Sequence, residues 1–379
     1  MPPPTTRRAA ARRDPRRAAA LRRALLAWYA AHRRPLPWRA TRDPYAIWVS
    51  EAMLQQTRVG TVEPYWRRFL ERLPTLRDLA AADEQTVLSL WSGLGYYRRA
   101  RALKQAAQAI VERHAGEFPR EREAALALPG VGPYTAGAVL SIAFDLPEPL
   151  VDGNVERVLS RVFALGGDRS QAAARRELWT LAAQLVPHGG GAADWNQALM
   201  ELGATLCTPR TPRCGSCPWS RQCAARRLGK TAELPPARPR SEPVDVRLLL
   251  AWIVRGERLL LERRPAGGRM AGLWQPPTIE RPGPGGRATG LFPSAWPFGA
   301  RIETGALLGV VRHGITRHRI VAEVAQGRLR GPLPGRGAAL EWIPRGRLAD
   351  LGLTGMARKV LRAPFAAART AARQAWVAP

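Results

Sequence analysis

The chain has 379 residues, 46% of them apolar, which is enough for two domains of ordinary size, each with its own core. It carries 59 Lys and Arg residues against 30 Asp and Glu residues, a formal net charge of +29 that favours a polyanionic partner, above all nucleic acid. No run of about eighteen apolar residues occurs, so the sequence predicts no membrane-spanning helix.

The first 23 residues form a basic segment with eight arginines and a single acid, Asp14. Such a composition cannot bury a core, so we expect a disordered basic arm over residues 1–23. No apolar segment typical of a secretory signal is present, which predicts a cytoplasmic, nucleoid-associated protein. The Arg-rich start leaves mitochondrial or nuclear targeting open.

Helical periodicity dominates residues 24–228. Apolar side chains recur at helical spacing, for example at Leu103, Ala107 and Ile110, and Pro-rich or Gly-rich breakers separate the helices. We therefore expect a mainly α N-terminal domain over this range.

The pattern changes after the helical region. Residues 229–245 are rich in Pro and charge and predict a semi-rigid linker. Residues 248–254 and 259–262 flank a short charged turn and predict two antiparallel strands. We expect a smaller α+β domain over residues 246–364 and a C-terminal tail over residues 365–379.

All four cysteines of the chain lie within seventeen residues, with the spacing C-x6-C-x2-C-x5-C. They are Cys207, Cys214, Cys217 and Cys223. This clustering argues against a disulfide framework and indicates a metal site. Thiolates bind zinc or iron–sulfur clusters, and zinc sites usually combine two C-x2-C pairs, whereas only one pair is that close here. The spacing favours a 4Fe–4S cluster and leaves zinc as the alternative.

A Gly-rich turn lies upstream of the cysteines, at residues 128–137. Its sequence is Leu-Pro-Gly-Val-Gly-Pro-Tyr-Thr-Ala-Gly. Two glycines in a turn between helices let backbone N–H groups approach a phosphate, and the next helix adds its positive N-terminal end. A lone G-x-G is more often an ordinary turn. The flanking residues make this segment resemble a helix-hairpin-helix element, in which Gly130, Gly132 and Thr135 are expected to contact DNA.

Some twenty residues later comes Leu-Val-Asp-Gly-Asn-Val, with Asp152 and Asn154. A hairpin, this aspartate and a downstream cysteine loop together resemble the helix-hairpin-helix glycosylase superfamily that includes endonuclease III. The resemblance implies a six-helix bundle with an iron–sulfur cluster domain.

Further residues narrow the resemblance to one branch of this superfamily. In relatives that also cut the DNA strand, a lysine that forms a Schiff base occupies the position of Tyr134, and a tyrosine cannot replace it. Residues 48–57, Trp-Val-Ser-Glu-Ala-Met-Leu-Gln-Gln-Thr, and residues 91–97, Trp-Ser-Gly-Leu-Gly-Tyr-Tyr, resemble the adenine DNA glycosylase (MutY) family. The resemblance covers residues 24–228. It implies monofunctional hydrolysis of adenine mispaired with 8-oxoguanine or guanine in duplex DNA, as the first step of base excision repair.

The chemistry of that reaction needs two carboxyl groups. Adenine leaves only when its ring is protonated, and a carboxylic acid held neutral by an apolar surrounding, as Glu51 is expected to be, can supply the proton. A second carboxylate, Asp152, can stabilise the oxocarbenium-like sugar. The resemblance assigns these roles and adds Tyr134 as a hydrogen-bonding partner and Asn154 as an orienting amide. Asp152 as a helix cap and Tyr134 as a packing residue stay open as alternatives.

The resemblance also implies residues that contact DNA or the extruded base, because a flipped base leaves a gap that must be filled. Gln56 and Tyr96 match wedge positions. The other matches are Arg34, Trp38, Arg39, Leu54, Thr57, Leu94 and Gly95. Core packing is the alternative for Leu54 and Leu94.

Residues 246–364 resemble a Nudix-like domain that inspects 8-oxoguanine, best seen in Gly-Leu-Trp-Gln-Pro-Pro at residues 272–277. The metal-binding R-E-x-x-E-E array of Nudix hydrolases is absent after it, so we expect a binding module without hydrolase activity. Thr316 lies where relatives carry their lesion-reading loop.

The predicted partner is duplex DNA containing an A:8-oxoguanine or A:G mispair, and the predicted state is a monomer. The sequence does not identify protein partners. An endonuclease III-like pyrimidine-lesion glycosylase and a non-catalytic iron–sulfur DNA-binding protein are the alternatives.

Overall fold

Two compact units make up the chain in its computed structural model. They are Met1–Ala81 with Ala102–Pro239, and Ala82–Arg101 with Arg240–Pro379. The structure describes residues 14–168, 171–237, 241–265, 270–282, 288–290, 292–333 and 340–363. Among these residues no helix is both long enough and apolar enough to cross a membrane.

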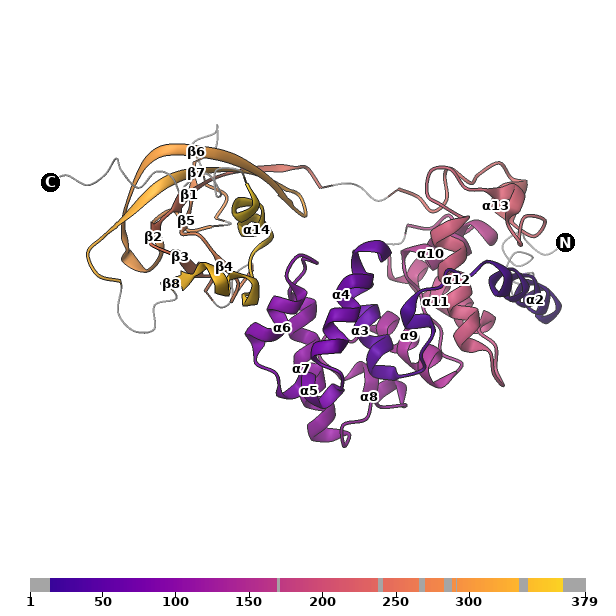
Figure 1. Ribbon diagram of the computed structural model, residues 1–379. Coiled ribbons are helices and arrows are strands. Elements are labelled where there is room, and N and C mark those ends of the chain that lie inside the picture. The colour runs from indigo at the N-terminus through magenta and orange to yellow at the C-terminus, as the bar shows by residue number, and fades with distance from the viewer. Residues whose placement is uncertain are drawn as a thin grey trace. The chain divides into compact units, whose positions relative to one another are not determined.

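The first unit is helical (Figure 1). Its helices are α2 (Pro15–His32), α3 (Pro44–Leu54), α4 (Val59–Arg72), α5 (Leu76–Ala81), most of α7 (Arg98–Arg113), α8 (Arg122–Leu126), α9 (Pro133–Phe144), α10 (Gly153–Val162), α11 (Ala172–Leu185), α12 (Ala192–Thr205) and α13 (Ala224–Arg227), with the short turns η1 (Pro37–Arg39) and η2 (Cys214–Ser216). Helix α6 (Glu84–Trp91) belongs to the second unit by its contacts.

Helix α2 corrects one expectation. It begins at Pro15, capped by the Asp14 side chain, which accepts a hydrogen bond from the Arg16 N–H at 2.9 Å. Leu21 and Leu25, four residues apart, are fully buried. A disordered arm over residues 1–23 is therefore wrong from residue 15 onward, because the arginines occupy faces of a helix whose leucines reach the core; residues 1–13 lie outside the described residues.

The core of the helical unit reaches the cysteine loop. Trp195 of α12 and Trp219 of that loop are both fully buried, with ring centroids 6.0 Å apart. The Trp219 indole N–H donates to the Leu21 carbonyl of α2 at 2.9 Å. The loop is thus packed onto α2 and α12.

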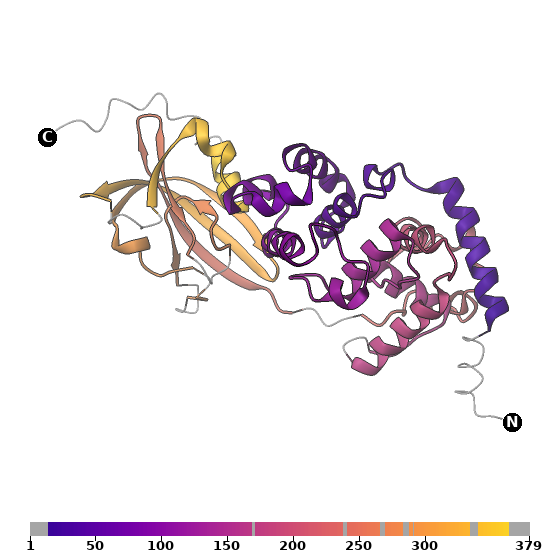
Figure 2. The same cartoon turned by 90° about the horizontal axis from the view of Figure 1, so that it is seen from below.

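The second unit is α+β (Figure 2). Its strands are β1 (Val244–Trp252), β2 (Val254–Arg255), β3 (Arg258–Arg263), β4 (Trp274–Gln275), β5 (Thr278–Arg281), β6 (Arg301–Ile315), β7 (His318–Arg330) and β8 (Leu340–Pro344), followed by η4 (Arg345–Asp350) and α14 (Gly355–Arg362), with η3 (Pro297–Gly299) before β6. One sheet has the order β5-β1-β7-β6, with β1 and β7 parallel, and β3 pairs with β2, β4 and β8 in the other. A helical region followed by an α+β domain, as predicted, is confirmed.

Candidate active site

A cavity of about 520 Å³ lies in the helical unit. The predicted site residues that line it are Arg34, Trp38, Arg39, Glu51, Leu54, Gln56, Thr57, Tyr134, Asp152 and Asn154. Residues from α3, α9, α10 and α12 face one another across this space, which is of the size of small-ligand sites in proteins.

Glu51 lies in a helix that is buried almost all round. Asp43 caps α3 by accepting from the Tyr45 and Ala46 N–H groups, and every residue from Tyr45 to Met53 is buried. Glu51 is 3% exposed, and the Tyr134 hydroxyl donates to its Oε2. Burial raises the pKa of Glu51 to about 7, against the opposing effect of this hydrogen bond. The side chain can therefore carry a proton at neutral pH.

The raised pKa of Glu51 predicts how stability depends on pH. The folded protein holds this proton up to a pKa of about 7, whereas the unfolded chain loses it near 4.5. The folded state thus binds more protons between these values, so the stabilisation is complete at pH below the unfolded pKa. It declines by on the order of 3 kcal/mol as the pH rises through the folded pKa. Urea unfolding at pH 5 and pH 8 should show a weaker pH dependence for Glu51→Gln than for the wild type; equal dependence would contradict the shift.

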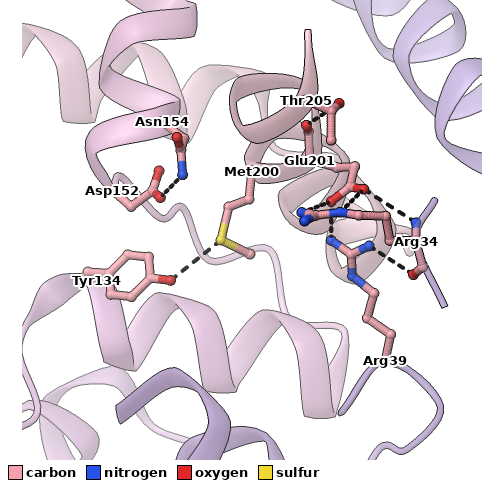
Figure 3. A network of polar contacts seen from close by, with 8 residues as sticks. All are labelled: Arg34, Arg39, Tyr134, Asp152, Asn154, Met200, Glu201 and Thr205. Atoms are coloured by element: carbon pink, nitrogen blue, oxygen red, sulfur yellow. Dashed lines mark hydrogen bonds and ion pairs between the residues drawn. The ribbon is translucent and has the colours of Figure 1, made fainter. Parts of the chain in front are cut away.

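Tyr134 occupies the first turn of α9, directly after the hairpin glycines. Its hydroxyl lies 3.4 Å from the Met200 sulfur of α12 (Figure 3). Burial raises the pKa of Tyr134 well above its ordinary value. It therefore keeps its proton and acts as a hydrogen-bond donor to Glu51, so it has a polar contact as well as a packing role.

Asp152 is both a helix cap and a member of the cavity wall. Its Oδ1 accepts from the Val155 N–H at 2.7 Å, and its Oδ2 accepts from the Asn154 amide at 2.8 Å (Figure 3). Burial raises the pKa of Asp152, while these bonds oppose the shift by stabilising the carboxylate. A side chain on Gly137 of α9 would meet the Pro149 carbonyl oxygen at 2.1 Å, so only glycine allows the segment that delivers Asp152 to lie this close.

Arg157 connects this aspartate to the cysteine loop. Its guanidinium donates to Asn154 Oδ1 at 2.9 Å and to the Cys207 carbonyl at 2.7 Å. Asn154, which orients Asp152, is itself held by a side chain that also holds the first cysteine.

The cavity wall carries an ion-pair network that was not predicted from the sequence. Glu201 of α12 has a fully buried side chain, and it accepts from Arg34 Nε and from an Arg39 terminal nitrogen, each at 2.7 Å (Figure 3). Burial acts to raise the pKa of Glu201, but the two guanidinium groups outweigh it and hold the pKa below its ordinary value. Arg34 and Arg39 are therefore engaged with protein, not simply solvated.

Helix α12 contributes Gln197, Met200, Glu201 and Ala204 to the cavity wall. The one available signal was an acid within the otherwise apolar helical run at residues 198–203, since a buried charge needs a partner.

Thr135 and Gly130 of the hairpin differ in what they can present. Thr135 as a whole is 3% exposed and its hydroxyl accepts from Gln55 at 3.3 Å, so the structure does not present this residue at the surface. Gly130 has a φ of +73°, and a Cβ on it would meet that of Ala102 at 2.5 Å. Gly132 directly precedes α9 as its N-cap.

Three predicted DNA-contact residues share a backbone strain. Gln56, Tyr96 and Thr316 have φ values of 56°, 49° and 51°, in the left-handed region that costs a non-glycine residue roughly 1 kcal/mol or more. All three side chains are exposed, and Thr316 lies in the turn between β6 and β7. Five other non-glycine residues in the described ranges also have positive φ values, so the strain alone does not identify the DNA-contact residues.

Leu94 and Gly95 lie beside Tyr96 in the second unit, and neither lines the cavity of the first unit. Leu94 is 7% exposed, which agrees with the core-packing alternative. Gly95 has a φ of +74° and takes part in the turn that presents Tyr96.

The four cysteines line one small cavity of about 20 Å³. Burial raises the pKa of Cys217 to about 11, and the other three thiols add to the shift. Arg161 donates to Cys207 Sγ at 3.4 Å. Within the described ranges, no group of three or more His, Cys, Asp or Glu side chains is arranged to hold a single metal ion.

The fold and the paired carboxyl groups define a helix-hairpin-helix DNA glycosylase. Residues 49–184 match the family model of the HhH-GPD superfamily base excision DNA repair protein. A solved structure of a thermostable thymine-DNA glycosylase is 34% identical, with a TM-score of 0.52, and the match covers 56% of this chain and 98% of that one.

Curated relatives identify the branch. The adenine DNA glycosylase of Rattus norvegicus is 38% identical over 369 residues, covering 83% of this chain and 71% of the rat protein. The adenine DNA glycosylase of Homo sapiens is 41% identical over 313 residues, covering 68% of this chain and 57% of the human protein. The chain belongs to the adenine DNA glycosylase family, whose enzymes hydrolyse an N-glycosyl bond and initiate base excision repair.

Proposed function

We propose that this enzyme is a monofunctional glycosylase that releases adenine mispaired with 8-oxoguanine or guanine in duplex DNA. The observation that carries the proposal is a buried, protonatable Glu51 hydrogen-bonded to Tyr134, in the same cavity as a hydrogen-bonded Asp152. Tyr134 stands where strand-cutting relatives carry a lysine, so the chain has no amine there to form a Schiff base.

The geometry supports a stepwise mechanism. Adenine leaves the base stack and enters the cavity. Glu51 transfers its proton to a ring nitrogen as the bond between N9 and C1′ breaks, so adenine departs as a neutral base. Asp152 stabilises the positive charge on the sugar. Water adds to C1′ and its proton returns to Glu51, which regenerates the acid and leaves an abasic site.

Recognition of the mispair falls to exposed loops. Gln56 and Tyr96, held in strained conformations, fill the gap in the stack. The C-terminal α+β domain reads the base opposite adenine in the manner of a Nudix-like binding module. The Thr316 hydroxyl lies at an exposed turn and donates to the Ile315 carbonyl at 2.7 Å, so its oxygen can accept a hydrogen bond from that base.

The direct test is single-turnover adenine release from A:8-oxoguanine, A:G and A:T duplexes. We expect release from the first two and little from A:T, with affinity that falls steeply as salt rises, because phosphate contacts dominate binding. Borohydride should trap no covalent complex. Trapping would support an endonuclease III-like enzyme, and no base release from any mispair would support a non-catalytic DNA-binding protein.

We further propose that the four cysteines hold a 4Fe–4S cluster. All four cysteines line one cavity, and only one pair has the C-x2-C spacing that zinc sites usually repeat, which favours the cluster over zinc. The cluster would supply cross-links that fold residues 207–223, and its positive iron would hold the thiols as thiolates against the burial that raises their pKa.

This cofactor assignment makes a testable prediction. Purified protein should contain iron and absorb broadly at about 400 nm, as iron–sulfur clusters do and zinc sites do not. Removing the iron should lower the melting temperature, because the loop that carries Trp219 loses its cross-links. Zinc content without iron or visible absorption would overturn the assignment.

A further inference from the structure

Two segments far apart in the sequence meet inside the second unit. One is the loop at residues 92–97, which carries Tyr96, and the other is Leu353, just before α14. The Leu353 carbonyl accepts hydrogen bonds from Ser92 Oγ at 3.1 Å and from the Tyr97 hydroxyl at 3.0 Å. Ser92 and Tyr97 are 2% and 8% exposed. One backbone oxygen thus holds both ends of the loop.

Leu353 itself belongs to the core of the α+β domain. The Trp274 N–H of β4 donates to the Gly352 carbonyl at 2.8 Å, and the Thr354 N–H returns a bond to the Trp274 carbonyl at 3.0 Å. Thr354 then caps α14 by accepting from the Ala357 N–H at 3.0 Å. The carbonyl is therefore fixed by a strand on one side and by a capped helix on the other.

The loop is constrained around Tyr96 as well. The Arg99 guanidinium lies 5.4 Å from the ring centroids of both Tyr96 and Trp91. Trp91 Nε1 donates to the Gly95 carbonyl at 3.2 Å, and the Tyr97 oxygen accepts from the Gly93 N–H at 3.3 Å. Tyr96 alone among the aromatic residues of this loop points outward, with 46% of its surface exposed.

A second set of contacts joins the same two parts of the unit. Gln85 of α6 donates to the Gly272 carbonyl at 3.0 Å and accepts from Trp274 Nε1 at 3.1 Å. The Arg358 guanidinium of α14 donates to the Ser92 carbonyl. The segment Ala82–Arg101 is thus bonded to the α+β domain at both its helix and its loop.

We propose that Ser92, Tyr97 and the Leu353 carbonyl form a clasp through which the C-terminal domain positions Tyr96 for insertion into the duplex. These three are positioning residues, since they act through Tyr96. The inference rests on the proposed function, which makes Tyr96 a wedge. It gives the C-terminal domain a second role, because the domain that reads the opposite base also holds the side chain that opens the stack.

The test replaces Tyr97 by Phe, which removes the hydroxyl and keeps the buried ring. Insertion is read as the fluorescence rise of 2-aminopurine placed beside an A:8-oxoguanine mispair, in the Glu51→Gln background so that no base is released. Loss of a buried hydrogen bond should lower the apparent insertion equilibrium roughly tenfold. Ser92→Ala removes the other hydrogen bond to the Leu353 carbonyl and should also lower the apparent insertion equilibrium.

Tyr45→Phe is the matched control. The Tyr45 hydroxyl is likewise buried and donates to a backbone carbonyl, that of Leu73, at 2.8 Å, but in the other unit. It should change the melting temperature about as much as Tyr97→Phe and leave the fluorescence unchanged. In a Tyr96→Ala background Tyr97→Phe should have no further effect, because both act on one step.

Each other outcome overturns the clasp: equal fluorescence losses in Tyr97→Phe and Tyr45→Phe, additive losses with Tyr96→Ala, or no fluorescence rise on any duplex. Because the readout needs no chemistry, it is separate from the proposed function. A protein that releases no adenine but shows the expected fluorescence pattern keeps the clasp and loses the catalytic proposal.

Discussion

Replacing Glu51 by Gln should lower the single-turnover rate of adenine release on the order of a thousandfold and leave duplex binding nearly unchanged. The amide keeps the size of the side chain and an oxygen to accept from Tyr134, but it has no acidic proton to give to adenine. The loss should therefore appear in the chemical step. Quench-flow measurement on an A:8-oxoguanine duplex gives the rate of the chemical step. A separate affinity measurement shows whether duplex binding has changed.

Glu262 supplies a matched control in the other unit. It is also 3% exposed, accepts from the Gln275 amide at 2.6 Å, and has a pKa that burial raises to about 7. Glu262→Gln therefore makes the same chemical change in a similar environment and should keep adenine release within about twofold. If Glu51→Gln released adenine near the wild-type rate, Glu51 would not be the acid; if both variants slowed equally, the loss would reflect stability.

The residues that carry the proposed chemistry could be predicted from the sequence, because each is marked by a pattern of nearby residues. Glu51 falls within an apolar helical run, which predicts burial and hence a raised pKa. Asp152 lies three residues before Val155, the spacing of a helix cap, and the structure shows that bond. The cysteines needed only their spacing to be read as one site, and the structure brings all four to one cavity.

Polar contacts between residues far apart in the sequence could not be predicted from such local patterns. Periodicity shows that a side chain is buried, but not which partner neutralises it. Arg34 and Glu201 are 167 positions apart, and Ser92 and Leu353 are 261 apart. The second contact uses a backbone carbonyl, which leaves no trace in residue types. The start of α2 was predicted wrongly for another reason. The boundary of the basic arm was set by the composition of residues 1–23, although Leu21 recurs with Leu25 at helical spacing.

Replacing Asp152 by Asn should slow adenine release about a hundredfold to a thousandfold while leaving stability almost unchanged. Asn caps helices as well as Asp does, so its oxygen can still accept from the Val155 N–H. The negative charge that stabilises the oxocarbenium-like sugar is lost. The Asn154 amide loses its acceptor, which costs about 1 kcal/mol. Removal of a buried charge, whose cost is shown by the raised pKa of Asp152, offsets this loss, so the melting temperature should change little.

Asp43→Asn separates this effect from capping. Asp43 caps α3 with bonds of 3.0 Å and 3.2 Å to the Tyr45 and Ala46 N–H groups, and it lies outside the cavity wall. The two variants make the same substitution at two helix caps, so only a role in chemistry can make Asp152→Asn much slower than Asp43→Asn. Equal rates would reduce Asp152 to a cap, and the positive charge on the sugar would then need another partner. Asn154 and Arg157 carry no negative charge, so Glu51, which lines the same cavity and becomes a carboxylate once it has given its proton to adenine, would then be the candidate.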